Sequence, residues 1–412
     1  MNRATRILVL ALSTLVLLYA GFGYALARTS QDGTYRSLGV FSEVLQRVEQ
    51  DYVEEPNMPL VTRGAMHGLV ESLDSQSGYL SAREYEDYKT RVKAQARGEI
   101  GVVLSKRFGY LLVLTTLPDS PAQKAGLSSG DILETIAGFS TREISIRQAE
   151  LLLQGEPGSI VKITEVRHGG TESQNLEITR AALAPPHLLA DKIEDDIAYI
   201  RVAAFTPGRA GEIRQKLAEF SRQGLRKLVL DLRGCASGSV PEAVSTANLF
   251  LSGGTIATLR GQTVPPKDFT ADPQRAVWTG PVTVLISAST AGPAEIVAAA
   301  LAQDRAVPTI GERTFGSASE QSVIALEDGG ALILTTALYH DPSGKALNET
   351  GVKPSVEMAN AGEEATDLED GAALEAPGHG PPAFPLRPHD DAVLKKAIEI
   401  LRSPAAAVGK AT

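Results

Sequence analysis

The hydrophobic pattern at the start of the chain is that of amphipathic helices. Apolar residues three or four positions apart share one helix face, and this spacing holds for Leu38, Phe41, Val44, Leu45 and Val48. The same spacing resumes from Leu60 to Leu73, after a break at residues 54–57. We therefore predict a helical N-terminal domain over residues 35–96.

A different pattern follows, in which short apolar runs alternate with turn residues. The segment from Ser120 to Leu133 reads SPAQKAGLSSGDIL, which predicts a helical turn starting at Pro121, a stop at Gly126 and a further turn into a strand. This signature resembles that of PDZ domains, and the resemblance extends over residues 97–182.

The resemblance to PDZ domains implies a peptide-binding site. Residues 98–102 stand at the position of the carboxylate-binding loop, which would receive a terminal carboxylate on the backbone N–H groups of Ile100, Gly101 and Val102. The strand that follows would pair with the peptide by strand addition, beside a helix over residues 144–154. Taken alone, the spacing of the two glycines in this loop is also that of an ordinary turn.

From about residue 190 the pattern changes to buried strands that alternate with amphipathic helices. The strand-like runs are residues 198–202, 227–232 and 282–286, and the helix-like runs are residues 212–220 and 294–302. Such alternation favours an α/β core with partly parallel strands. We predict a peptidase-like α/β domain over residues 190–358. The fold class is then mixed α/β plus a PDZ domain (α+β), behind a helical N-terminal segment.

Composition supports a globular protein of several domains. At 412 residues the chain is long enough for two or three domains that each bury a core. The net charge of −9 gives no reason to expect nucleic acid as a partner, which needs a clustered basic surface. Cys235 is the only cysteine and no Cys/His spacing suggests a metal site, so we expect no disulfide, metal or other cofactor.

Residues 1–30 carry the signal of an exported protein. Residues 7–27 contain no charged side chain, a length close to the ~20 residues that cross a bilayer as a helix. Arg3 and Arg6 precede this segment and favour export of everything after it. We expect an inner-membrane anchor facing the periplasm. A cleaved signal that leaves a periplasmic protein is the alternative, because Ala25-Leu26-Ala27 has the small-x-small form of a cleavage site.

The end of the chain has the composition of a linker and a helix. The stretch between Lys353 and Arg387 contains several acidic residues and no Lys or Arg, and its second half is rich in proline. This composition predicts a solvated linker over residues 359–389. Residues 390–402 have the pattern of a capped amphipathic helix.

Two segments of the α/β domain resemble the active-site core of the C-terminal processing (tail-specific) peptidases, a family of serine–lysine proteases. Residues 286–298 read ISASTAGPAEIVA, and residues 311–321 read GERTFGSASEQ. In the family, the nucleophilic serine stands three residues before the glutamate of the first segment, and the lysine base follows T-F-G in the second. The resemblance covers roughly residues 37–401 without the linker.

The resemblance implies that both reactive groups are missing. Counting back from Glu295 places Gly292 at the nucleophile position, and the T-F-G run places Ser317 at the position of the base. Glycine has no side chain to attack a carbonyl, and a serine cannot replace a lysine base. Gln321 is retained at the position of the family's orienting glutamine.

The oxyanion loop also departs from the family pattern. Residues 230–238 read LDLRGCASG where the family reads D-L-R-N-N-P-G-G, so Ser237 and Gly238 occupy the positions of its two glycines. Pro293, directly after Gly292, removes another backbone N–H group from the site.

Three residues near the site are fallback candidates for a nucleophile. Thr290 and Ser289 lie two and three residues before Gly292, but on a strand-to-helix turn their side chains would point elsewhere and would still lack a base. Cys235 lies in the oxyanion loop, and the favoured interpretation is a small buried thiol.

These features favour a proteolytically degenerate homologue that binds protein or peptide C-termini as an adaptor or regulator in the cell envelope. One alternative is an active serine-type envelope endopeptidase that processes protein C-termini with unconventional catalytic residues. Another is an assembly scaffold that uses the PDZ domain. We expect contact with the membrane through the N-terminal anchor. The sequence is also compatible with a homo-oligomer.

Overall fold

The computed structural model describes residues 37–93, 98–107, 109–304, 307–359 and 391–403. The chain divides into two compact units, residues 1–68 and residues 69–412. The predicted anchor over residues 1–30 and nearly all of the predicted linker over residues 359–389 lie outside the described residues. Among the helices of the described ranges, none combines the length and the apolarity needed to cross a bilayer. The predicted domain boundaries stay predictions.

The described part of the first unit is helical, in agreement with the apolar spacing. One helix covers residues 37–51, and α2 (Met58–Glu71) begins in this unit. The side chain of Asn57 caps α2, since its Oδ1 accepts the N–H group of Leu60 at 3.2 Å.

The region predicted to be a PDZ domain is an antiparallel sheet closed by two short helices. Its strands are β2 (Val102–Arg107), β3 (Tyr110–Thr116), β4 (Ile132–Ile136), β5 (Phe139–Ser140), β6 (Ile160–Val166) and β7 (Ser173–Thr179). They lie in the order β2-β3-β4-β6-β7, with β5 paired to β4. The helices are α4 (Pro121–Lys124) and α5 (Ile146–Leu153), which Ser120 and Ser145 cap with their side chains.

The centre of the second unit is a six-stranded sheet with helices on both faces. In sheet order the strands are β17 (Val356–Glu357), β14 (Thr309–Gly311), β13 (Val282–Ile286), β10 (Lys227–Asp231), β9 (Ile197–Arg201) and β8 (Leu189–Lys192). All are parallel except β8, which is antiparallel to β9. The parallel strands are nearly continuous apolar runs, as expected of strands that are buried on both faces.

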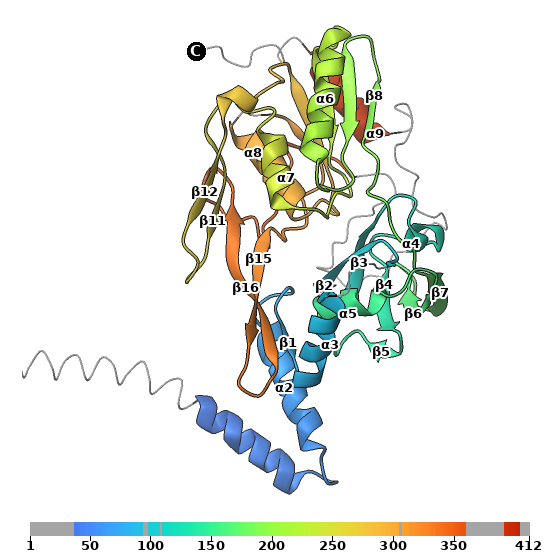
Figure 1. The fold of residues 1–412 in the computed structure, drawn as a ribbon, viewed down its shortest axis with the longest axis vertical. Helices are drawn as coiled ribbons and strands as arrows, with labels where there is room; N and C mark the ends of the chain where they lie inside the picture. The colour runs from blue at the N-terminus through green and yellow to red at the C-terminus, as the bar shows by residue number, and fades with distance from the viewer. Residues whose placement is uncertain (1–36, 94–97, 108, 305–306, 360–390, 404–412) are drawn as a thin grey trace, which may run out of the picture. The chain divides into compact units, whose positions relative to one another are not determined.

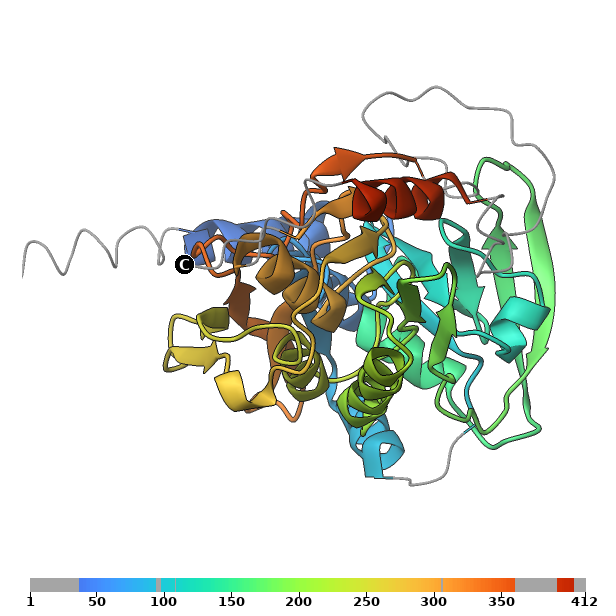
Figure 2. The ribbon, with the colours of Figure 1, turned by 90° about the horizontal axis from the view of Figure 1, so that it is seen from above.

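Alternating residues of each strand explain which helix covers which face. α6 (Arg209–Arg222), α7 (Val240–Ala247) and α8 (Pro293–Asp304) share one apolar core with inward residues such as Leu228 and Leu230. α9 (Ala392–Arg402) shares a second core with the intervening residues, such as Val229. Figure 2 shows α9 (red) across the sheet from the green and yellow helices. The predicted mixed α/β fold class is confirmed by this architecture.

A second, antiparallel sheet lies beside this α/β core. It contains β1 (Gly78–Leu80), β11 (Thr255–Arg260), β12 (Lys267–Thr270), β15 (Ser319–Ala325) and β16 (Ala331–His340). β16 pairs with β1 and β11 along one edge and with β15 along the other. Figure 1 shows the long hairpin of β15 and β16 in orange. The remaining described elements are α3 (Ala82–Lys93) and the 3-10 helix Pro273–Arg275.

A buried ionic network fixes α9 to the sheet. The Arg233 guanidinium donates to Asp231 at 2.6 Å and to Asp391 at 2.7 Å, and all three side chains are at most 3% exposed. Tyr199 donates a further hydrogen bond to Asp231 at 2.7 Å. Burial acts to raise the pKa of Asp231, but the adjacent Arg233 guanidinium outweighs it and holds that pKa below its usual value. Asp391 is the N-cap of α9, one residue later than the predicted start of this helix.

Candidate functional site

Three loops leave the carboxyl ends of neighbouring parallel strands and meet at one edge of the sheet. They follow β10 (residues 232–238), β13 (residues 287–292) and β14 (residues 312–318). This edge is where open α/β sheets bind their ligands. The loops carry the predicted oxyanion, nucleophile and base positions, so the structure brings these positions together.

Gly292 lies directly before α8 with a left-handed backbone (φ +56°). A methyl group built on its Cα would meet only the Ser317 Oγ atom, at 4.0 Å. The predicted nucleophile position is therefore open, and it faces Ser317 at the predicted position of the base. Its backbone is one that L-residues adopt only with strain.

Glu295 ties these two positions together. Its carboxylate is fully buried and accepts hydrogen bonds from the N–H of Gly292 (2.9 Å), the Oγ1 of Thr314 (2.5 Å), and the N–H groups of Gly316 (2.7 Å) and Ser317 (2.8 Å). Burial raises its pKa, and these four donors oppose the rise. One side chain thus holds the backbone at the predicted nucleophile and base positions.

Sequence reasoning used Glu295 only as a reference point and missed this role. Its signal was its place in the first turn of α8, where a carboxylate can accept free backbone N–H groups. Gln321, by contrast, donates from Nε2 to Ser319 Oγ (2.9 Å) and to Thr335 Oγ1 (3.4 Å), so it makes contacts within its own sheet.

The predicted oxyanion loop is fixed to the segment after β9 and to the loop after β13. A side chain at Gly238 would lie 2.4 Å from the backbone of Phe205, which explains the glycine. The Ser237 carbonyl accepts the N–H of Phe205 at 2.9 Å. The Cys235 carbonyl accepts the N–H of Ala291 at 3.0 Å. Pro293 lacks an N–H group, so one potential donor for an oxyanion is absent from the site.

Comparison with known proteins agrees with the predicted peptidase-like α/β domain. Residues 196–358 match the model of peptidase family S41. The α/β domain belongs to family S41. The chain is 29% identical over 397 residues to a carboxy-terminal-processing protease of Bartonella bacilliformis, and the match covers 92% of this chain and 91% of the relative. It is 28% identical over 346 residues to the carboxy-terminal processing protease CtpA of Bacillus subtilis, covering 84% and 74%.

A solved structure shows the same fold. The photosystem II D1 C-terminal processing protease superposes with a TM-score of 0.65 at 25% identity, over 80% of this chain and 94% of that protein. This likeness extends beyond the S41 domain, because that domain occupies less than half of the chain.

The fallback nucleophiles of this S41 domain are held in structural contacts. Thr290 is fully buried, donates from Oγ1 to the Leu232 carbonyl (2.9 Å) and accepts the Ser287 N–H (2.9 Å). Ser289 is 1% exposed, and its Oγ lies 3.0 Å from that of Ser129. Burial raises the pKa of the Cys235 thiol to about 12, which keeps it protonated and unreactive. The geometry gives none of the three a nucleophile's setting.

The predicted carboxylate-binding loop has the backbone that such a loop needs. Gly101 has φ +76°, and a side chain there would lie 2.4 Å from the Cβ of Ser120. The carbonyls of Ile100 and Gly101 accept hydrogen bonds from α4 and from Leu117. In the described part of the chain, their N–H groups have no hydrogen-bond partner. Val102 opens β2 and pairs with Thr116.

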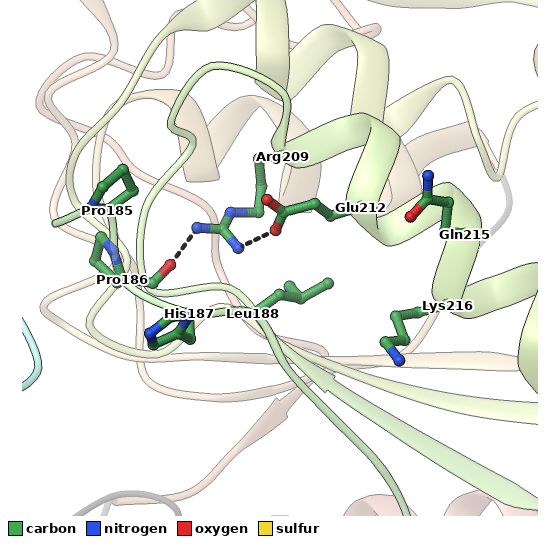
Figure 3. A pocket seen from close by; sticks show the side chains of 8 residues that line it. All are labelled: Pro185, Pro186, His187, Leu188, Arg209, Glu212, Gln215 and Lys216. Atoms are coloured by element: carbon green, nitrogen blue, oxygen red, sulfur yellow. Dashed lines mark hydrogen bonds and ion pairs between the residues drawn. The ribbon is translucent and has the colours of Figure 1, made fainter.

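A surface pocket of about 290 Å³ lies away from this site, between the chain at residues 185–188 and α6. Figure 3 shows Arg209 at its wall, held by Glu212 and by the Pro186 carbonyl. The other lining residues are Pro185, His187, Leu188, Gln215 and Lys216. None of them belongs to the three loops, so the pocket is separate from the S41 site. Within the described ranges, no group of three His, Cys, Asp or Glu residues is placed to hold a metal ion.

Proposed function

We propose that this protein is a proteolytically inactive S41 homologue that binds protein C-termini in the cell envelope, as an adaptor or regulator. The observation that supports the proposal is that the two reactive side chains are absent while the backbone around their positions is held in place. Gly292 offers no nucleophile and Ser317 no amine, whereas the Glu295 hydrogen bonds hold the surrounding backbone in place. Hydrolysis needs both missing groups, but peptide binding needs neither.

Tail binding is supported by the loop at residues 98–102. The Ile100 and Gly101 N–H groups have no hydrogen-bond partner among the described residues, and β2 is an edge strand next to them. Backbone donors that converge on a carboxylate beside a strand edge are the mode by which PDZ domains capture C-termini. We assign this role to residues 97–182. We also propose that the protein faces the periplasm and is anchored through residues 1–30.

An active endopeptidase is the second candidate, because the relatives named above are processing proteases. It requires a displaced nucleophile, and the contacts of Thr290, Ser289 and Cys235 oppose that role.

The test incubates the full chain, in detergent, with an unfolded protein that ends in an apolar C-terminus. Fragments are sought by mass spectrometry, and tail binding is measured in parallel with free and amidated C-termini. We expect intact substrate and saturable binding that amidation abolishes. Fragments from the purified wild type would overturn the proposal, and Thr290, Ser289 and Cys235 would then be substituted in turn. Intact substrate with no affinity for either tail would instead favour the assembly scaffold.

A further inference from the structure

The outer edge of β15 is a free strand edge beside the S41 site. β15 begins at Ser319, two residues after Ser317, and pairs only with β16 in the described part of the chain. β1 and β11 occupy the other edge of β16, which leaves β15 outermost. An exposed edge of this kind is a ready template for another extended chain.

The hydrogen-bond phase of the hairpin shows which backbone groups face outward. The Leu326 N–H donates to the Gly330 carbonyl at 2.8 Å, next to the pair Ala325 and Ala331. Bonded and non-bonded pairs alternate in an antiparallel ladder. Ile324 and Ser322 therefore bond to β16.

The remaining β15 residues of this ladder point their backbone groups the other way. They are Gln321, Val323 and Ala325, at every second position. An independent contact agrees, because Thr335, the partner of Gln321, donates its N–H to Ser77 on the far edge of β16 at 3.1 Å. The free edge thus presents three N–H and C=O pairs in one row.

The exposed apolar side chains of β15 favour the binding of an extended peptide along this edge. Val323 and Ile324 are 42% and 43% exposed, although β-branched residues gain most when a neighbouring strand covers them. The row of outward groups starts at Gln321, only four residues after Ser317, so it begins beside the site.

We propose that the free edge of β15 binds an extended polypeptide tail by strand addition, through the backbone of Gln321, Val323 and Ala325. The inference rests on the proposed function and names where the body of the bound tail lies. Its recognition is by main-chain hydrogen bonds, so it accepts varied sequences with β-branched or other apolar side chains next to Val323 and Ile324.

Val323 allows a direct test. Its N–H faces outward, so Val323→Pro removes a donor from the peptide ladder and leaves the bonds to β16 in place, at a position where strands tolerate proline. Val323→Thr is the matched control, because it keeps the N–H group and the β-branch. The probe is a labelled twelve-residue peptide with a free apolar C-terminus, measured by fluorescence anisotropy on the full chain in detergent.

We expect Val323→Pro to weaken peptide binding about fivefold, the value of one hydrogen bond, and Val323→Thr to leave it unchanged. The amides of residues 319–325 should exchange more slowly with deuterium when the peptide is bound. Equal thermal midpoints of both variants exclude misfolding as the cause.

Each failure has its own signature. Peptide binding that Val323→Pro leaves intact, with no protection of β15, overturns this inference alone. No peptide binding by the wild type overturns the proposed function and the inference together. Protection that depends on protein concentration without peptide overturns the inference in favour of a second copy of this chain on the edge.

Discussion

Rebuilding the dyad tests whether the S41 frame is intact. The perturbation is Gly292→Ser with Ser317→Lys. The space at Gly292 is open, since a Cβ there meets only the Oγ of Ser317 at 4.0 Å. The cost is the left-handed backbone, roughly 1–2 kcal/mol for an L-residue. The Glu295 hydrogen bonds come from backbone groups and Thr314, so neither substitution removes one.

The rebuilt dyad still lacks an oxyanion donor. Pro293 has no N–H group, and one missing donor costs on the order of 10²–10³ in kcat. We therefore expect slow cleavage by the double variant and about a hundredfold faster cleavage when Pro293→Ala is added. Gly292→Ser alone should remain inactive because no base accompanies it.

The assay follows fragments of an unfolded protein by mass spectrometry. Gly292→Ser with Ser317→Met is the matched control, because methionine has a similar length to lysine and no amine. Far-ultraviolet circular dichroism and thermal unfolding establish that each variant is folded. A folded triple variant without activity would refute the claim that the frame is preserved, and cleavage by the wild type would refute the claim that the dyad is missing.

Three further predictions concern groups buried in the α/β domain. Asp391→Ala leaves the buried Arg233 without one of its partners, and we expect the free energy of unfolding to fall by about 3–5 kcal/mol. Denaturant titrations followed by the fluorescence of the buried Trp278 measure this change. Lys396→Ala, on the exposed side of α9, is the neutral control. The pKa of Asp231 is lowered in the folded state. Its contribution to stability is therefore present above its unfolded pKa of about 3.9 and is lost as the pH falls toward the folded value. Unfolding midpoints that stay constant from pH 5 to pH 2 would contradict this prediction. Cys235 should resist a thiol reagent at pH 8 in the folded protein and react at once in denaturant, because burial raises its pKa to about 12. Rapid labelling of the native protein would make Cys235 a candidate nucleophile again.

Local patterns were sufficient to predict much of this fold. The predicted strand at residues 282–286 is β13, and the helix-like run at residues 212–220 lies within α6. These elements are visible in the sequence because their apolar spacing is set by the core that each one faces. The positions of Gly292 and Ser317 in adjacent loops also followed from the sequence, through the family resemblance.

Pairings between distant segments were not visible in the sequence. Arg233 and Asp391 are 158 positions apart, and no local pattern connects them. The partnership of β1 with β16 and the outward edge of β15 depend on register, which is a property of two strands together. The contact of Ser129 with Ser289 likewise joins two loops whose sequences give no sign of it.

The hydrogen bonds of Glu295 support the proposed binding function of this site. A fully buried carboxylate is costly, and an apolar side chain of similar size often serves stability as well or better. What Glu295 supplies is position, because its four hydrogen bonds fix the backbone of Gly292 and of the loop at Gly316 and Ser317. A backbone fixed in this way supports the proposal of a preformed peptide site, which lies next to the start of the strand whose edge is free. Under that proposal, a bound peptide stays uncut because Gly292 offers no nucleophile.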